Sequence, residues 1–505
     1  MILKLISIIV LVLFLVLNII RKNHFDNFTD YEPKNYIFKN QYLIVHENEN
    51  ENKNVINDIY KINFDNLNFY IGSDLEFYNN QKGKNKIFII GLVIDPLNYK
   101  RTIEEIGNNL ITSTNIDNLF NKVQNLSGRF TIYFNLNGNK IIFNDCCALK
   151  RIFYLKNKVV FSSSEKIILN FFNLKKNIPK DKKDYINSTR YRNSEFKWYD
   201  NSGFNENIKL VLPNTYYNIE NKNIKRIPFF FPNIKDYNQI CQRISDIIGN
   251  SIKCLIFRNY KLIQPITAGS DSRVLLSCVK QNLKNINFYI FNNNKLKNSA
   301  NVDAIVAKKI LNKFNLNFKD IKIKNDKLSD KFKILYSQNH VIPRILPKTK
   351  NIEYHFNNNL GKININGNCA EVLKEYFNNS DLIKSFEIFR LKIRQKNNIN
   401  YIQKSIKKYF EENVNFCIKN NIDICNLYYW ELQQGLWGSL YPYEQDIAIN
   451  EFSPFNNRSL LLLGLSTERK NRTSKSGYKL FQDIISKNFP ELMFIKFNPK
   501  INEII

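Results

Sequence analysis

The 505-residue chain has few of the residues that hold small cross-linked or metal-bound proteins together. It contains 8 cysteines and 4 histidines, and no two cysteines stand in a Cys-x-x-Cys spacing. Eight scattered cysteines in so long a chain do not form a disulfide framework, and they give little support to a structural zinc site. Free thiols in a reducing compartment are therefore expected.

Acidic residues are also scarce, since 74 lysines and arginines outnumber 45 aspartates and glutamates and leave a net charge of +29. Such a charge suggests a nucleic acid or an anionic membrane surface as a partner. The lysines are spread along the chain, however, which favours solvated faces in a sequence of biased codon usage. We therefore expect no nucleic acid partner.

Apolar residues are abundant, at 44% of the chain with 39 phenylalanines and 27 tyrosines. This excludes wholesale disorder, and the length favours two or three folding units.

The first 20 residues are almost wholly apolar and long enough to cross a bilayer core as a helix. A cleaved signal peptide is the alternative, but small residues near a cleavage point are missing. We predict a retained transmembrane anchor over residues 1–22. Arg21 and Lys22 on its C-terminal flank place the body in the cytoplasm.

Short apolar runs separated by Asn/Gly turns follow, which is typical of antiparallel strands. They predict strands at residues 86–94, 130–134, 140–143 and 159–162, with helices at 102–111 and 116–123. Residues 23–173 are therefore expected to form a layered α+β domain. Residues 174–232 are interpreted as a Lys-rich linker and a hairpin, with strands at 216–219 and 224–229.

The pattern changes after Pro232 to alternating strands and helices. Helices are predicted at residues 237–257, from 272 and at 300–314, and strands at 262–267, 286–291, 318–323 and 362–366. This alternation indicates an α/β domain over residues 233–505, with a doubly wound parallel sheet. Ligands of such sheets gather at the carboxyl ends of the strands.

A candidate phosphate-binding loop follows the first of these strands, with the sequence Thr267-Ala268-Gly269-Ser270-Asp271-Ser272-Arg273. Small residues let the backbone approach a phosphate, and the start of the next helix offers free N–H groups. Asp271 would repel phosphate alone but suits Mg²⁺ bridging the phosphates of ATP. The alternative is an ordinary helix cap.

This loop resembles the Ser/Thr-Gly-Gly-x-Asp-Ser loop of the ATP-pyrophosphatase fold, and its Arg273 resembles the asparagine synthetase family in particular. Ala268 replaces the first glycine, a costly change if a positive φ is needed. A second segment, Asn366-Gly367-Asn368-Cys369-Ala370-Glu371, is similar to the second glycine-containing loop of that family. The resemblance implies that residues 267–273 and Gly367 bind ATP, that Asp271 and Glu371 hold Mg²⁺, and that Glu371 is also a catalytic candidate.

Further segments extend the resemblance toward the C-terminus. Lys479 stands where the family has a lysine that offsets charge on the phosphates, with Arg472 and Lys475 as rivals. The segment 451–458 resembles the Pro-Phe-Leu-Asp motif, with Asn457 where aspartate is usual. Asp303 matches an acidic helix-start position but ranks low, because a carboxylate there is also ordinary dipole compensation.

Segments at 126–130, 144–145, 151–154 and 161–164 resemble the glutamine amidotransferase domain of asparagine synthetases, which implies an Ntn-type first domain. The glutaminase of that family uses an N-terminal cysteine. Here the first cysteine is Cys146, so we expect no glutamine hydrolysis.

The leading hypothesis is an ATP-dependent ligase that adenylates a small-molecule carboxylate, releases pyrophosphate and passes the acyl group to ammonia or an amine. The alternatives are a catalytically degenerate membrane-anchored scaffold of the same fold and an RNA-modifying ATP pyrophosphatase. The sequence gives no oligomeric state.

Overall fold

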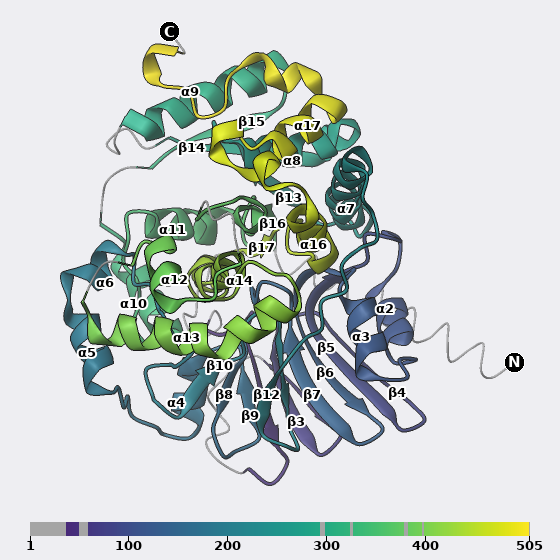
Figure 1. Ribbon diagram of the computed structural model, residues 1–505, viewed down its shortest axis with the longest axis vertical. Coiled ribbons are helices and arrows are strands. Elements are labelled where there is room, and N and C mark those ends of the chain that lie inside the picture. The colour runs from purple at the N-terminus through teal and green to yellow at the C-terminus, as the bar shows by residue number, and fades with distance from the viewer. Residues whose placement is uncertain are drawn as a thin grey trace, which may run out of the picture.

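The computed structural model describes residues 37–49, 59–292, 298–323, 327–377, 382–395 and 398–503. A sheet-rich unit formed by the first half of the chain lies below a unit built around a parallel sheet in the view of Figure 1. All eight cysteines are free thiols.

The sheet-rich unit contains two six-stranded antiparallel sheets, in the orders β10-β8-β9-β1-β3-β2 and β12-β11-β7-β6-β5-β4. Their facing sides form one apolar core, in which the rings of Phe69 and Phe88 stack with centroids 3.9 Å apart. The strands are β1 (Tyr42–His46), β2 (Ile59–Phe64), β3 (Leu67–Gly72), β4 (Phe77–Lys82), β5 (Asn85–Ile94), β6 (Ser127–Leu136), β7 (Asn139–Asn144), β8 (Phe153–Leu155), β9 (Val160–Ser162), β10 (Ile208–Leu210), β11 (Thr215–Asn218) and β12 (Asn223–Arg226).

Helices cover the outer faces of both sheets. α2 (Ile103–Leu110) and α3 (Ile116–Val123) pack on the second sheet, and α4 (Glu165–Phe171) packs on the first. α2 begins at a capping box in which Thr102 and Glu105 satisfy each other's backbone N–H groups. The strands and helices predicted between residues 86 and 162 are confirmed, and so is the layered α+β class. The Ntn-type assignment stays a prediction.

The segment interpreted as a linker is more structured than its composition suggests. It contains α5 (Lys180–Asn187) and α6 (Thr189–Asn193), whose Tyr185 and Tyr191 are buried while the lysines of α5 other than Lys182 face solvent. The predicted hairpin is present as β11 and β12, and β11 pairs with β7, which joins it to the second sheet. The domain boundary near residue 232 stays a prediction.

The upper unit contains a five-stranded parallel sheet in the order β15-β14-β13-β16-β17. This confirms the predicted parallel α/β sheet, and the four predicted strands are present. The sequence did not reveal β17. The strands are β13 (Leu262–Pro265), β14 (Ile286–Asn292), β15 (Phe318–Lys322), β16 (Ile363–Ile365) and β17 (Asn450–Phe452).

Helices surround this sheet, and further helices lie beside it (Figure 1). One apolar core joins the strands to α7, α8, α9, α16 and α17. A second core joins α12, α13 and α14 to the first sheet of the lower unit, and α10 and α11 form a smaller cluster. The bounds of the helices are α7 (Tyr237–Phe257), α8 (Ser270–Cys278), α9 (Asn298–Lys313), α10 (Asp330–Asn339), α11 (Thr349–Asn358), α12 (Phe386–Lys392), α13 (Asn400–Lys419), α14 (Ile424–Tyr428), α15 (Leu440–Gln445), α16 (Arg458–Ser466) and α17 (Lys479–Asn488), with the 3₁₀ turns η2 (Lys280–Asn285), η3 (Ala370–Leu373), η5 (Arg469–Arg472), η6 (Ser474–Ser476), η7 (Pro490–Phe494) and η8 (Ile501–Glu503) and the π-helix η4 (Tyr429–Gly438).

The membrane placement predicted from the sequence is corrected. Among the described residues no helix is both long enough and apolar enough to span a bilayer. Residues 1–22, to which the anchor was assigned, lie outside the described residues. Neither the anchor nor the membrane location derived from it is retained.

Candidate functional site

The strand order creates a switch point between β13 and β16. From β13 the sheet grows through β14 and β15 on one side, and from β16 through β17 on the other. The loops leaving β13 and β16 therefore diverge at the carboxyl edge, where ligands of such sheets bind. The residues predicted from the sequence to bind ATP and metal lie on or next to these two loops.

The loop after β13 is held by its own side chains. The Thr267 N–H donates to Ser272 Oγ at 3.2 Å, and the two hydroxyl oxygens lie 3.1 Å apart. The Gly269 N–H donates to Thr267 Oγ1 at 3.3 Å. Gly269 is the N-cap of α8 and supplies no side-chain cap, so the free N–H groups at the start of this helix are the part of the loop suited to an anion. Thr267 and Ser272 shape the turn instead of pointing their donors outward.

Ala268 fits the turn without strain. Its φ is not among the positive values, so the Cβ that replaces the family's glycine costs nothing. Its N–H donates to Asp303 Oδ1 at 2.8 Å, and burial raises the pKa of this carboxyl. Asp303 on α9, ranked low from the sequence, therefore anchors the loop.

Arg273 has a structural position instead of a ligand-facing one. It is fully buried, and its guanidinium donates to the carbonyl oxygens of Ala268 at 3.0 Å, Ile495 at 2.5 Å and Lys496 at 3.2 Å. It thereby fastens the C-terminal segment to the loop, and the Asn498 N–H also donates to Ala268 O. This explains the arginine after the Asp-Ser pair without a contact to phosphate.

Gly367, on the loop after β16, lies against Asp271. A Cβ at this position would come 2.7 Å from the Asp271 Cβ, which is closer than side chains pack. Only glycine therefore lets the two loops approach here. Two residues on, Cys369 adopts a left-handed φ of 72°, a conformation that is costly for a residue with a side chain.

Lys374 joins the two predicted metal ligands and was missed by sequence reasoning. Its ammonium lies 2.8 Å from Asp271 Oδ1 and also pairs with Glu371 Oε1, at the end of η3. Burial opposes its charge, but the carboxylates of Asp271 and Glu371 raise its pKa above the ordinary value. The only signal in the sequence is a lysine three residues after Glu371.

The arrangement does not fit Mg²⁺ between Asp271 and Glu371, because an ammonium already bridges them. In addition, the described part of the chain holds no group of three or more His, Cys, Asp or Glu side chains placed to bind a metal. The start of α8 offers free N–H groups to an anion, and the Lys374 ammonium offsets part of the negative charge of Asp271 and Glu371.

Lys479 does not join this cluster through its observed contacts. It is the first residue of α17, its side chain is half exposed, and its ammonium pairs with Asp483 and lies over the Tyr237 ring. Arg472, the rival cation, is buried and bonds Glu375 Oε2 at 3.2 Å, one residue beyond Lys374. Its Nε and Nη1 have no hydrogen-bond partner in the described chain.

A cleft of about 290 Å³ opens beside the second loop. Asn366 and Asn368, which flank Gly367, line it together with Arg344, Lys348, Trp437, Gly438 and Tyr441. Behind it, burial raises the pKa of Glu451 on β17 to about 7, although the amides of Asn364 and Asn366 donate to its carboxylate. The cleft therefore adjoins the loop that carries Gly367.

The segment 451–458 forms part of the contact between the two units. Asn457 caps α16 by accepting the Leu460 N–H, and its amide donates to Asn125 O at 2.8 Å. Asn456 donates to Asp145 Oδ1 at 2.8 Å and accepts the Cys147 N–H. An asparagine at position 457 is thus explained by structure.

Comparisons with known proteins assign the chain to no family. No protein-family model matches the chain, and no curated protein matches it. Among solved structures the chain is similar to the NH₃-dependent NAD synthetase of Campylobacter jejuni subsp. jejuni NCTC 11168 in complex with the nitrate ion. The match covers 40% of this chain and 95% of that chain, at 16% identity and a TM-score of 0.21. A likeness this weak carries no conclusion about activity.

Proposed function

We propose that the protein is an ATP-dependent ligase that forms a C–N bond, adenylating a small carboxylate and releasing pyrophosphate. The observation that carries this is the convergence of two loops at the switch point of the parallel sheet. An uncapped helix start, Gly367 and the Lys374 cluster meet there, next to an open cleft. The resemblance of these two loops to those of asparagine synthetases also supports this proposal.

In this proposal each residue has a limited role. The start of α8 from Ser270 to Ser272 receives the phosphates of ATP, and Thr267 with Ser272 fixes the turn. Lys374 offsets negative charge at that position, whereas Mg²⁺, if required, binds through the nucleotide and not between Asp271 and Glu371. The cleft lined by Asn366 and Asn368 takes the carboxylate, and ammonia or an amine accepts the acyl group.

A catalytically degenerate scaffold is the second candidate. The Asp271–Lys374–Glu371 cluster favours it, because a satisfied ion-pair cluster needs neither nucleotide nor metal to be stable. The two candidates differ in one property, since a scaffold does not bind ATP.

The deciding experiment is exchange of labelled pyrophosphate into ATP, with calorimetric titration of ATP beside it. Replacing Asp271 by Ala should abolish exchange, because Asp271 holds the Lys374 ammonium beside the start of α8. The matched control is Asp246→Ala, an exposed carboxylate on α7, which should exchange like the unaltered protein. Absence of ATP binding by the unaltered protein would establish the scaffold, and exchange retained by Asp271→Ala would refute the assigned site.

A further inference from the structure

A second cavity lies away from the phosphate loop, between the first antiparallel sheet and the helices of the upper unit. Its volume is about 60 Å³. At ~10–15 Å³ for each water-sized group, it has room for about four to six non-hydrogen atoms. Aromatic side chains form much of its wall: Phe153, Tyr191, Phe196, Trp198, Phe204 and Tyr443.

Arg151 is a charged residue of this cavity without an ion-pair partner among the described residues, and is called unbalanced here for that reason. The side chain is buried, and its Nε and Nη2 donate to Ser439 Oγ at 3.1 and 2.9 Å and to Leu436 O. No carboxylate of the described residues lies within ion-pair distance, and Nη1 has no hydrogen-bond partner among them. Burial lowers the pKa of Arg151 to about 10, so the group stays charged at neutral pH. A buried cation without an anion is costly.

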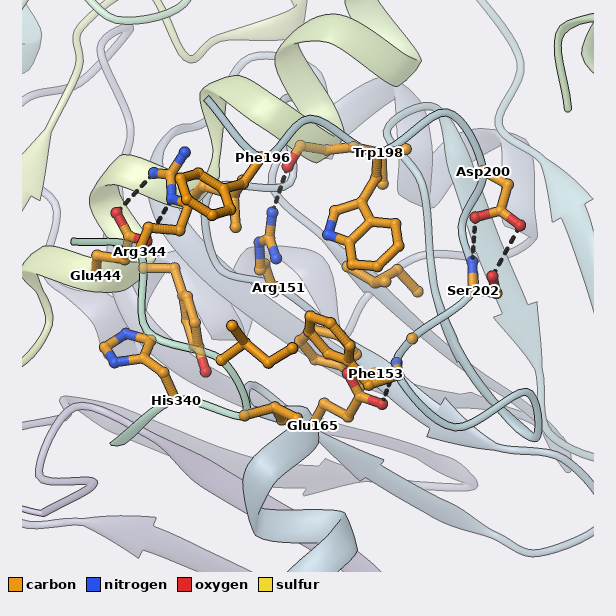
Figure 2. Close-up of a pocket in the computed structure, with 18 of the residues that line it drawn as sticks. Arg151, Phe153, Glu165, Phe196, Trp198, Asp200, Ser202, His340, Arg344 and Glu444 are labelled. Atoms are coloured by element: carbon orange, nitrogen blue, oxygen red, sulfur yellow. Dashed lines mark hydrogen bonds and ion pairs between the residues drawn. The ribbon is translucent and has the colours of Figure 1, made fainter. Parts of the chain in front are cut away.

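Glu165 is the corresponding unbalanced acid. Its Oε1 accepts the backbone N–H groups of Phe204 at 2.6 Å and Asn205 at 3.0 Å, but Oε2 has no hydrogen-bond partner in the described chain. Burial raises the pKa of this carboxyl to about 7. Arg151 and Glu165 thus line the same cavity without touching each other (Figure 2).

The other charged groups of the wall satisfy one another. Arg344 forms a two-point ion pair with Glu444, at 2.5 and 2.6 Å. Asp200 pairs with Lys182 at 3.3 Å and accepts the Ser202 hydroxyl at 2.8 Å. Burial lowers the pKa of His340, whose Nδ1 donates to Tyr336 O. Figure 2 shows Arg151 between the Arg344–Glu444 pair and the Trp198 ring, with Glu165 on a different part of the wall.

We propose that this cavity is a binding site for a small free α-amino acid, glycine or alanine. Its carboxylate would accept from Arg151 Nη1, and its ammonium would donate to Glu165 Oε2. A zwitterion satisfies both unbalanced groups at once, whereas a simple anion or a simple amine satisfies only one. The volume limits the side chain to about one non-hydrogen atom. The proposal does not depend on the ligase activity, although Arg344 lines both this cavity and the cleft beside Gly367.

Calorimetric titration of the full-length protein with glycine and L-alanine tests this, with acetate, methylammonium and L-phenylalanine as comparison ligands. The two small amino acids should bind, acetate and methylammonium should bind about tenfold or more weakly, and L-phenylalanine should not bind because of its size. Absence of binding by both small amino acids would overturn the proposal.

Two variants locate the ligand. Arg151→Met should weaken L-alanine and acetate alike, by about tenfold or more. Glu165→Gln keeps an oxygen for the Phe204 and Asn205 N–H groups, so it should fold, and it should weaken L-alanine but not acetate. If Arg151→Met does not fold, the selective effect of Glu165→Gln decides. Equal L-alanine affinity in Glu165→Gln and the unaltered protein would refute the site, and Asp246→Ala serves as the control that should bind normally.

Discussion

At the scale of single residues, Lys374 determines how charge is arranged at the mouth of the parallel sheet. It is buried between Asp271 and Glu371, so two carboxylates share one ammonium and carry a single net negative charge. A phosphate at the start of α8 would therefore meet less repulsion than the acidic residues alone would cause.

Replacing Lys374 by Met should make ATP binding depend on divalent cation. Without the ammonium, Asp271 and Glu371 repel the phosphates unless Mg²⁺ neutralises them. Titration of ATP in excess EDTA and in excess Mg²⁺ measures this. The unaltered protein should show similar affinities in the two conditions, and the variant should lose about tenfold or more in EDTA. An equally strong Mg²⁺ requirement in both proteins would contradict this role for Lys374.

Glu451 should make the stability of the protein depend on pH. Burial raises its pKa in the folded state to about 7, from an ordinary value of 4.5. The folded protein therefore keeps a proton that the unfolded chain releases, and stability is full below pH 4.5 and is lost as the pH rises to about 7. The loss amounts to about 3 kcal/mol. Urea denaturation of the unaltered protein and of Glu451→Gln, compared at pH 5 and pH 8, isolates this effect. Glu165 and the buried histidines are present in both proteins, so their contributions to the pH dependence cancel in the difference. A stability difference that does not change with pH would contradict it.

At the scale of elements, the approach of the two loops depends on Gly367. Replacing it by Ala places a methyl group 2.7 Å from the Asp271 Cβ, so one loop must move. We expect this variant to remain folded, with a loss of stability of about 1–3 kcal/mol, and to bind ATP about tenfold or more weakly. Circular dichroism and calorimetry measure the two effects. Unchanged ATP affinity would show that nucleotide binding does not need the two loops in contact.

The sequence predicted elements well where local signals agreed. The apolar spacing of α7 and α3 and the turn signals around β5 and β7 located these elements to within one residue, whereas β6 extends three residues before and two residues beyond its predicted range. The short strand β17 has only three residues and was interpreted as part of a motif. α5 and α6 were missed because the lysines of α5 and the arginines of α6 hide their buried tyrosines. The phosphate loop was found from its residue types, whereas Lys374 and the Arg151–Glu165 cavity depend on contacts between distant segments, which no local pattern encodes.

At the scale of the whole molecule, buried polar contacts join the sheet-rich unit to the parallel-sheet unit. Arg129 of β6 forms a two-point ion pair with Asp446, at 2.8 and 3.0 Å, and both side chains are buried. The Trp430 indole N–H donates to Cys146 O at 2.8 Å across the same boundary. The two units therefore share a buried interface.

Replacing Arg129 by Met should destabilise the protein by about 3–5 kcal/mol, since it leaves Asp446 buried without its main partner. The protein should still unfold in one cooperative transition, because Asn456 and Trp430 continue to join the units. Differential scanning calorimetry measures both properties. Two separate transitions in the unaltered protein would contradict the shared interface, and a loss below about 1 kcal/mol would contradict the importance of this pair.

The same ion pair has a consequence for biosynthesis. Arg129 and Asp446 are 317 residues apart in the chain. At about 5–20 residues per second, the ribosome needs on the order of tens of seconds to deliver the second partner after the first. During this interval the Arg129 guanidinium can already donate to Leu149 O but lacks the carboxylate that neutralises it, and chains released before residue 446 would carry this uncompensated charge and be targets for quality control.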